Sequence, residues 1–63
     1  MRRFKITYKR TDLNDGINYS IIYESEKAET PEQTLQELRQ NTQHIYYTAI
    51  IHAEQIRVDA LED

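Results

Sequence analysis

A chain of 63 residues buries only about 60% of the surface that its unfolded form exposes, so an isolated domain of this size is marginally stable. Cysteine is absent, which excludes disulfide bonds and thiolate metal sites as additional stabilisers. The formal net charge is −3, yet the first ten residues hold five of the eight basic residues and no acid.

No apolar run is long enough to span a bilayer, and the first residues lack the apolar core of a signal peptide. We therefore expect one cytoplasmic domain, residues 1–63, that does not bind a membrane. Small domains are usually stabilised by disulfides, by a metal or by association with another subunit. Association is the stabiliser that we expect for this chain.

Residues 3–9 alternate between polar and apolar side chains, a period that is typical of a strand with one buried face. Phe4, Ile6 and Tyr8 occupy the apolar face. The pattern predicts a first strand whose other face is basic and solvated.

Residues 10–16 mix Thr, Asp and Asn with the only glycine, and Asp15-Gly16 is a turn signal because glycine tolerates positive φ. Alternation resumes over residues 17–24, with one face formed by Ile17, Tyr19, Ile21 and Tyr23 and the other by Asn18, Ser20, Ile22 and Glu24. We predict a hairpin whose second strand runs antiparallel to the first.

The segment Thr30-Pro31-Glu32-Gln33 combines an N-cap, a proline at the first helical position, an acid in the first turn and a capping-box glutamine. A helix is therefore predicted to begin at Pro31. Asn41 is a suitable C-cap, so the helix should end near residues 41–43.

Residues 45–51 are rich in β-branched and aromatic side chains and favour a third strand, apolar on both faces. A helix over residues 43–56 is the competing interpretation. Residues 52–55 are interpreted as a turn or bulge, Ile56-Arg57-Val58 as a short extension or fourth strand, and the acidic tail 59–63 as frayed.

The predicted fold is a small α+β domain of order β-β-α-β(β), with one helix packed on a three- to four-stranded, mainly antiparallel sheet. This order, the small size and the lack of cysteine resemble those of many short phage, prophage and mobile-element proteins. The likeness is one of architecture and implies no functional residue.

Nothing in the chain matches a catalytic or cofactor motif: it has no cysteine, no glycine-rich phosphate loop and no pair of histidines on one helical face. His44 and His52 are interpreted as polar residues at the ends of strands. We expect a non-enzymatic protein without cofactor or metal.

One short helix cannot cover both faces of a strand at residues 45–51, so apolar surface is expected to remain open there. Exposed apolar and aromatic surface usually marks an association site. We therefore expect a homodimer formed through the sheet or its edge, and a protein partner. The candidate contact residues are Tyr46, Tyr47, Thr48 and Ile50.

The basic first strand suggests an alternative, nucleic-acid binding, in which cations contact phosphates and interleaved tyrosines stack on bases. The opposing interpretation is that these cations solvate the outer face of an edge strand. The acidic residues of the remainder suggest a separate hypothesis, a mimic of a phosphate backbone, against the plainer interpretation that they maintain solubility. The residues of the basic set are Arg2, Arg3, Lys5, Lys9 and Arg10.

Overall fold

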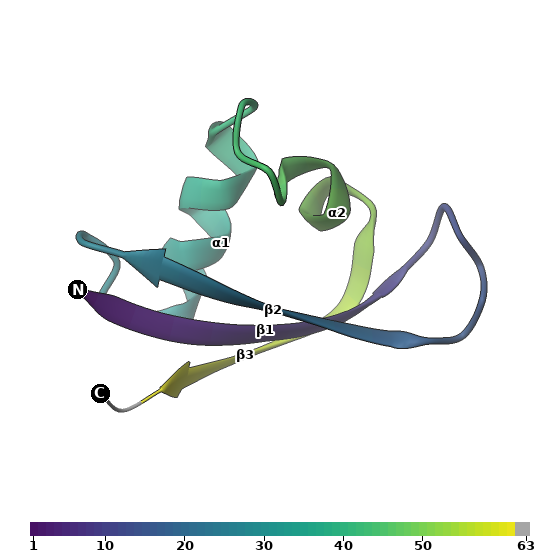
Figure 1. Cartoon of the computed structure of the whole chain (residues 1–63), viewed down its shortest axis with the longest axis horizontal. Coiled ribbons are helices and arrows are strands. Elements are labelled where there is room, and N and C mark those ends of the chain that lie inside the picture. Colours follow the sequence, from purple (N-terminus) through teal and green to yellow (C-terminus); the bar gives the residue numbers. More distant parts are fainter. Residues whose placement is uncertain (62–63) are drawn as a thin grey trace.

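The computed structural model describes residues 1–61 of the chain, and it shows a small α+β domain with both helices on one side of a three-stranded sheet (Figure 1). The element order is β1, β2, α1, α2 and β3. Their bounds are β1 Arg2–Arg10, β2 Asn18–Ser25, α1 Pro31–Gln40, α2 Tyr47–Ile51 and β3 Ala53–Leu61.

The strand order is β2-β1-β3, and both pairings are antiparallel. The predicted hairpin of the first two strands is confirmed, with Phe4 opposite Tyr23 and Ile6 opposite Ile21. β1 is the central strand, so the interpretation of the basic segment as an edge strand was wrong. The edges are β2 and β3.

The third strand lies at Ala53–Leu61 and not at residues 45–51, which is a correction to the sequence-based prediction. Residues 47–51 form the short helix α2 instead, so the competing helical interpretation was right for this part of the segment. The tail predicted to fray is paired as far as Leu61, which lies opposite Arg3. Residues 62 and 63 of that tail are outside the described residues.

Packing against the first helix explains why a segment of high β propensity is helical here. A helix places Tyr46, Ala49 and Ile50 on one side, where all three pack against the core. The strand preference of β-branched residues is mainly a preference for a half-buried pleated surface, and tertiary contacts override it. Ile45 and Ile51 then remain outside, at 83% and 48% exposure.

The first helix follows its predicted capping box. Thr30 Oγ1 accepts from the N–H of Gln33 at 3.4 Å, and Gln33 Oε1 accepts from the N–H of Thr30 at 3.2 Å. Asn41 is the C-cap. Thr34 and Leu38 are buried on the face toward the sheet.

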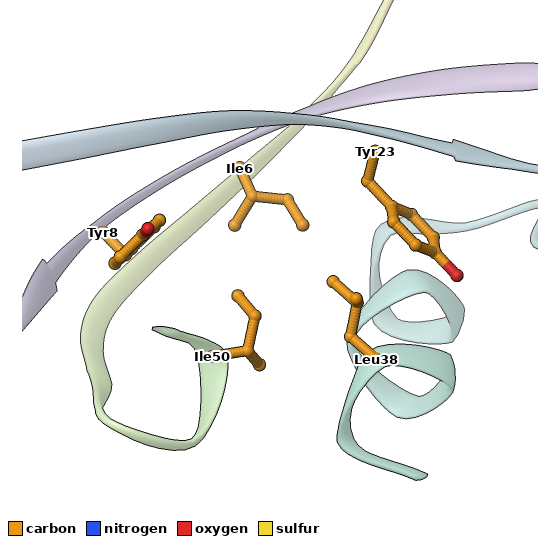
Figure 2. Packing of buried hydrophobic residues seen from close by; sticks show 5 residues of the cluster. All are labelled: Ile6, Tyr8, Tyr23, Leu38 and Ile50. Atoms are coloured by element: carbon orange, nitrogen blue, oxygen red, sulfur yellow. The ribbon is translucent and has the colours of Figure 1, made fainter. Parts of the chain in front are cut away.

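The core lies between the sheet and the two helices, and Figure 2 shows side chains of β1, β2, α1 and α2 in it. β3 adds the partly buried Ile56 and Val58, which pack against this group. Ile6 of β1 lies above the space between Leu38 of α1 and Ile50 of α2, and both helical residues are fully buried. Tyr8 and Tyr23 flank this group. β1 therefore supplies the centre of both the sheet and the core.

Candidate functional site

Because α1 and α2 cover the same side of the sheet, the other face is open (Figure 1). Residues directly opposite in an antiparallel pair share a face, so the register identifies what lies on it. The open face carries Arg3, Lys5, Thr7 and Lys9 of β1, Asn18, Ser20, Ile22 and Glu24 of β2, and Glu54, Arg57, Asp59 and Leu61 of β3.

The five basic residues singled out in the sequence are divided between the two faces. Arg2 and Arg10 lie on the helix side, where Arg2 Nη1 donates to the carbonyl of Glu29 at 3.1 Å. Arg10 forms a two-bond ion pair with Asp12, at 2.8 and 2.5 Å. This pair holds the pKa of Asp12 below its usual value, chiefly through the hydrogen bonds.

Arg3, Lys5 and Lys9 form a row along the centre of the open face, and each has an acid directly opposite it on a neighbouring strand. The pairs are Arg3 with Glu24, Lys5 with Asp59, and Lys9 with Glu54. Opposite charges at such positions stabilise a sheet. The basic row is therefore partly neutralised by its own edge strands.

The tyrosines of the hairpin lie on the covered face, away from this basic row. Tyr8 and Tyr19 stack with ring centroids 6.0 Å apart, and Tyr23 is buried against α1. Among the described residues, no aromatic side chain of the strands shares the open face with the cations. The interleaving of tyrosines and cations on which the alternative hypothesis of base stacking depends is thus not present on this surface.

The four candidate contact residues of the third segment have different environments. Ile50 is 1% exposed and belongs to the core, so its side chain is not available to a partner. Tyr46 and Tyr47 are half-buried, and Thr48 is exposed. Tyr46 also packs beside His44, whose Nδ1 accepts from the Tyr46 N–H at 3.1 Å.

The outer edge of β2 is the least protected backbone in the sheet. Within residues 1–61 no strand pairs with it, and β2 has one charged residue in eight, Glu24. Ile22, on the open face beside this edge, is 46% exposed. Edge strands are ordinarily protected from further pairing by charges, proline or bulges, and among these β2 has only its single charge.

The other edge, β3, carries such protection. Its register against β1 shifts between Thr7 and Lys9, and Gln55 adopts a positive φ of 52° at this bulge. β3 also has three charged residues in nine, of which Arg57 and Asp59 form an ion pair at 3.2 Å. The contrast identifies β2 as the edge that can accept another strand.

A partly buried polar cluster fixes β2 to α1 on the helix side. Ser25 Oγ donates to Glu37 at 2.9 Å and accepts from the N–H of Ala28 at 2.9 Å, while the Tyr23 hydroxyl donates to Glu37 at 3.1 Å. Burial, followed by this bond to Glu37, raises the pKa of Tyr23 to about 12.

A shallow hollow of about 360 Å³ adjoins this cluster, beside Tyr23 and the C-terminal end of α1. It lies on the side of the sheet to which an added strand would direct half of its side chains. Its lining residues are Tyr23, Lys27, Glu37, Gln40 and Asn41.

Sequence reasoning did not identify the β2 edge as a site, because the strand order is set by residues far apart in the chain. The available signal was Ile22, a lone isoleucine on the polar face of its strand. Within residues 1–61, no group of three or more potential ligand side chains is placed to hold a metal ion.

No family model, curated protein or solved structure gives a significant match to this chain. No helix among residues 1–61 combines the length and apolar character needed to cross a membrane.

Proposed function

We propose that this chain is a non-enzymatic binding protein that assembles by strand pairing at the outer edge of β2. The observation that carries the proposal is the combination of an unpaired, nearly uncharged edge with the exposed side chain of Ile22. Addition of a strand satisfies backbone groups along the edge, while pockets for alternate side chains provide specificity.

The energetic need for a partner follows from the size of the domain. Among residues 1–61 the core is small, and its largest fully buried side chains are Phe4, Ile6, Leu38, Ile50 and Thr34. An added strand extends the sheet and buries apolar area at Ile22, and each net hydrogen bond contributes about 0.5–1.5 kcal/mol.

The open face is less suited to self-association than the edge. If two copies packed face to face with their strands nearly aligned, the row of Arg3, Lys5 and Lys9 would approach the same row of the other copy. Bringing like charges together out of water is costly. Pairing at the edge leaves both rows in solvent.

The test is the concentration dependence of mass, measured by sedimentation equilibrium, for the wild-type chain and two matched variants. Ile22→Lys places a charge at the edge and is expected to weaken assembly at least about tenfold. Ile45→Lys makes the same change at an isoleucine that is 83% exposed near α2, and assembly should persist.

Each outcome decides a part of the proposal. Loss of assembly in Ile45→Lys but not in Ile22→Lys would move the contact to the surface of α2, where Tyr46, Tyr47 and Thr48 lie. A wild-type chain that stays monomeric at high micromolar concentration would show that the chain does not self-associate. The proposed role of the β2 edge in assembly would then lose its main support.

Nucleic-acid binding through β1 is the second candidate, since four cations and three acids lie on the open face of a chain whose net charge is −3. The cations are Arg3, Lys5, Lys9 and Arg57, and the acids are Glu24, Glu54 and Asp59. An anisotropy titration with labelled single-stranded DNA tests it: binding should weaken steeply as salt increases and should fall in Lys5→Ala/Lys9→Ala.

A further inference from the structure

We infer that the strand that pairs with the edge of β2 is β2 of a second copy, antiparallel, with a twofold axis midway between Ile22 of one copy and Ile22 of the other. The inference rests on the proposed function and specifies its partner and register. The result would be a six-stranded sheet of order β3-β1-β2-β2-β1-β3.

Symmetry leaves few registers for such a pair. A twofold axis perpendicular to the sheet keeps the open faces of both copies on the same side, and opposite residues must share a face. The residue nearest the axis therefore pairs with the same residue of the second copy. Near the middle of Asn18–Ser25, this residue is Ile21 or Ile22.

The register centred on Ile22 matches side chains better on the open face. Ile22 is 46% exposed in one chain and would pack against Ile22 of the second copy. Ser20 would lie opposite Glu24 of the second copy, a hydroxyl donor facing a carboxylate acceptor. In the register centred on Ile21, each Ile22 would instead lie opposite a serine.

The helix side is also compatible with the register centred on Ile22. There, Ile21 of the second copy would lie opposite Tyr23, an aromatic and β-branched pair of the kind that stabilises sheets. The hollow lined by Tyr23, Glu37 and Gln40 shares Tyr23 with this position. No pair of like charges lies directly opposite within residues 19–25 of the two copies.

Disulfide trapping tests the register directly, because the chain has no cysteine of its own. Directly opposite residues in antiparallel strands have Cα atoms about 4.5–5.5 Å apart, which suits a disulfide, whereas diagonal neighbours are too distant. Ile22→Cys alone should link into a covalent dimer in glutathione redox buffer. Ile45→Cys, at the highly exposed isoleucine near α2, serves as the collisional control and should link at least about tenfold more slowly.

Mixed variants distinguish the two registers. Ser20→Cys mixed with Glu24→Cys should give the heterodimer, and Ser20→Cys alone should not link to itself. Preferential linking of Ser20→Cys to Ile22→Cys would contradict the register centred on Ile22 and support the register centred on Ile21.

The failure of this inference is separable from that of the proposed function. If the wild-type chain assembles and Ile22→Lys prevents assembly, but Ile22→Cys links no faster than Ile45→Cys, the edge is used and the symmetric register is wrong. If the wild-type chain is monomeric, self-association itself is overturned.

Discussion

The hydroxyl of Tyr23 donates to the carboxylate of Glu37 across 3.1 Å and joins the edge strand β2 to α1. Ser25 donates to the same carboxylate at 2.9 Å, so one acidic side chain accepts from two hydroxyls. These contacts hold the C-terminal half of β2 against α1, while its outer edge has no strand partner among residues 1–61. The geometry of the proposed contact edge therefore depends on Glu37.

Replacing Glu37 with alanine should lower the free energy of unfolding by about 1–3 kcal/mol, because two buried hydroxyls lose a charged acceptor. Urea denaturation measures the change. Gln36→Ala, at the exposed neighbouring position of α1, is the matched control and should change stability by less than about 0.5 kcal/mol. Equal effects of the two substitutions would show that the cluster contributes nothing specific.

The raised pKa of Tyr23 predicts a loss of stability in alkali. The unfolded tyrosine titrates near pH 10.0 and the folded one near 12, so the folded state favours the protonated phenol. This contribution is complete below pH 10.0 and is lost as the pH rises toward about 12.

Urea denaturation between pH 9 and pH 12 should therefore show a steeper decline in stability for the wild type than for Tyr23→Phe. The Tyr47→Phe variant keeps the bond between Tyr23 and Glu37 and should decline as the wild type does. A parallel decline in all three proteins would count against the assignment to Tyr23.

Ile50 and Ile51 are adjacent in sequence and opposite in environment, at 1% and 48% exposure. Ile50→Ala should cost about 2–5 kcal/mol, since it empties space between Leu38 and Ile6, whereas Ile51→Ala should cost less than about 1 kcal/mol. Thermal or urea unfolding compares them. A larger cost at Ile51 would contradict the helical placement of this segment.

The contrast between Ile50 and Ile51 also shows which parts of the fold could be predicted from the sequence and which could not. The helix beginning at Pro31 was predictable because its capping groups lie within four residues of one another. The strand at residues 3–9 was predictable because its alternation admits one interpretation. Residues 45–51 are apolar on every side, so no hydrophobic period distinguishes a strand from a helix. Packing against Leu38 of α1 determines that the segment is helical.

The site was less accessible to sequence reasoning than the fold. β2 is an edge only because β3 pairs with β1, and that pairing joins residues as distant as Arg3 and Leu61. Local patterns do not encode such a choice. The one local signal was Ile22, an apolar residue on a polar face, and its exposure is explained by its position beside the unpaired edge.

The bulge of β3 gives a prediction about backbone strain. Gln55 has a φ of 52°, a conformation that costs a non-glycine residue about 1–2 kcal/mol, against about 0.5–1 kcal/mol for the extra flexibility of glycine. Gln55→Gly should therefore raise the free energy of unfolding by up to about 1.5 kcal/mol. Gln55→Ala should not raise it, and a stabilisation by alanine equal to that by glycine would contradict the role of φ.

Salt separates the two proposed modes of binding. Each copy carries a net charge of −3, so pairing at β2 brings together two molecules that repel each other at long range. Raising the salt concentration from 0.05 to 0.5 M screens this repulsion and should strengthen self-association roughly twofold to fivefold by sedimentation equilibrium. Binding to DNA through Lys5 and Lys9 would weaken over the same range, because counterions compete for the phosphates. Self-association that weakens with added salt would imply that attraction between opposite charges holds the copies together, which the nearly uncharged edge of β2 does not provide.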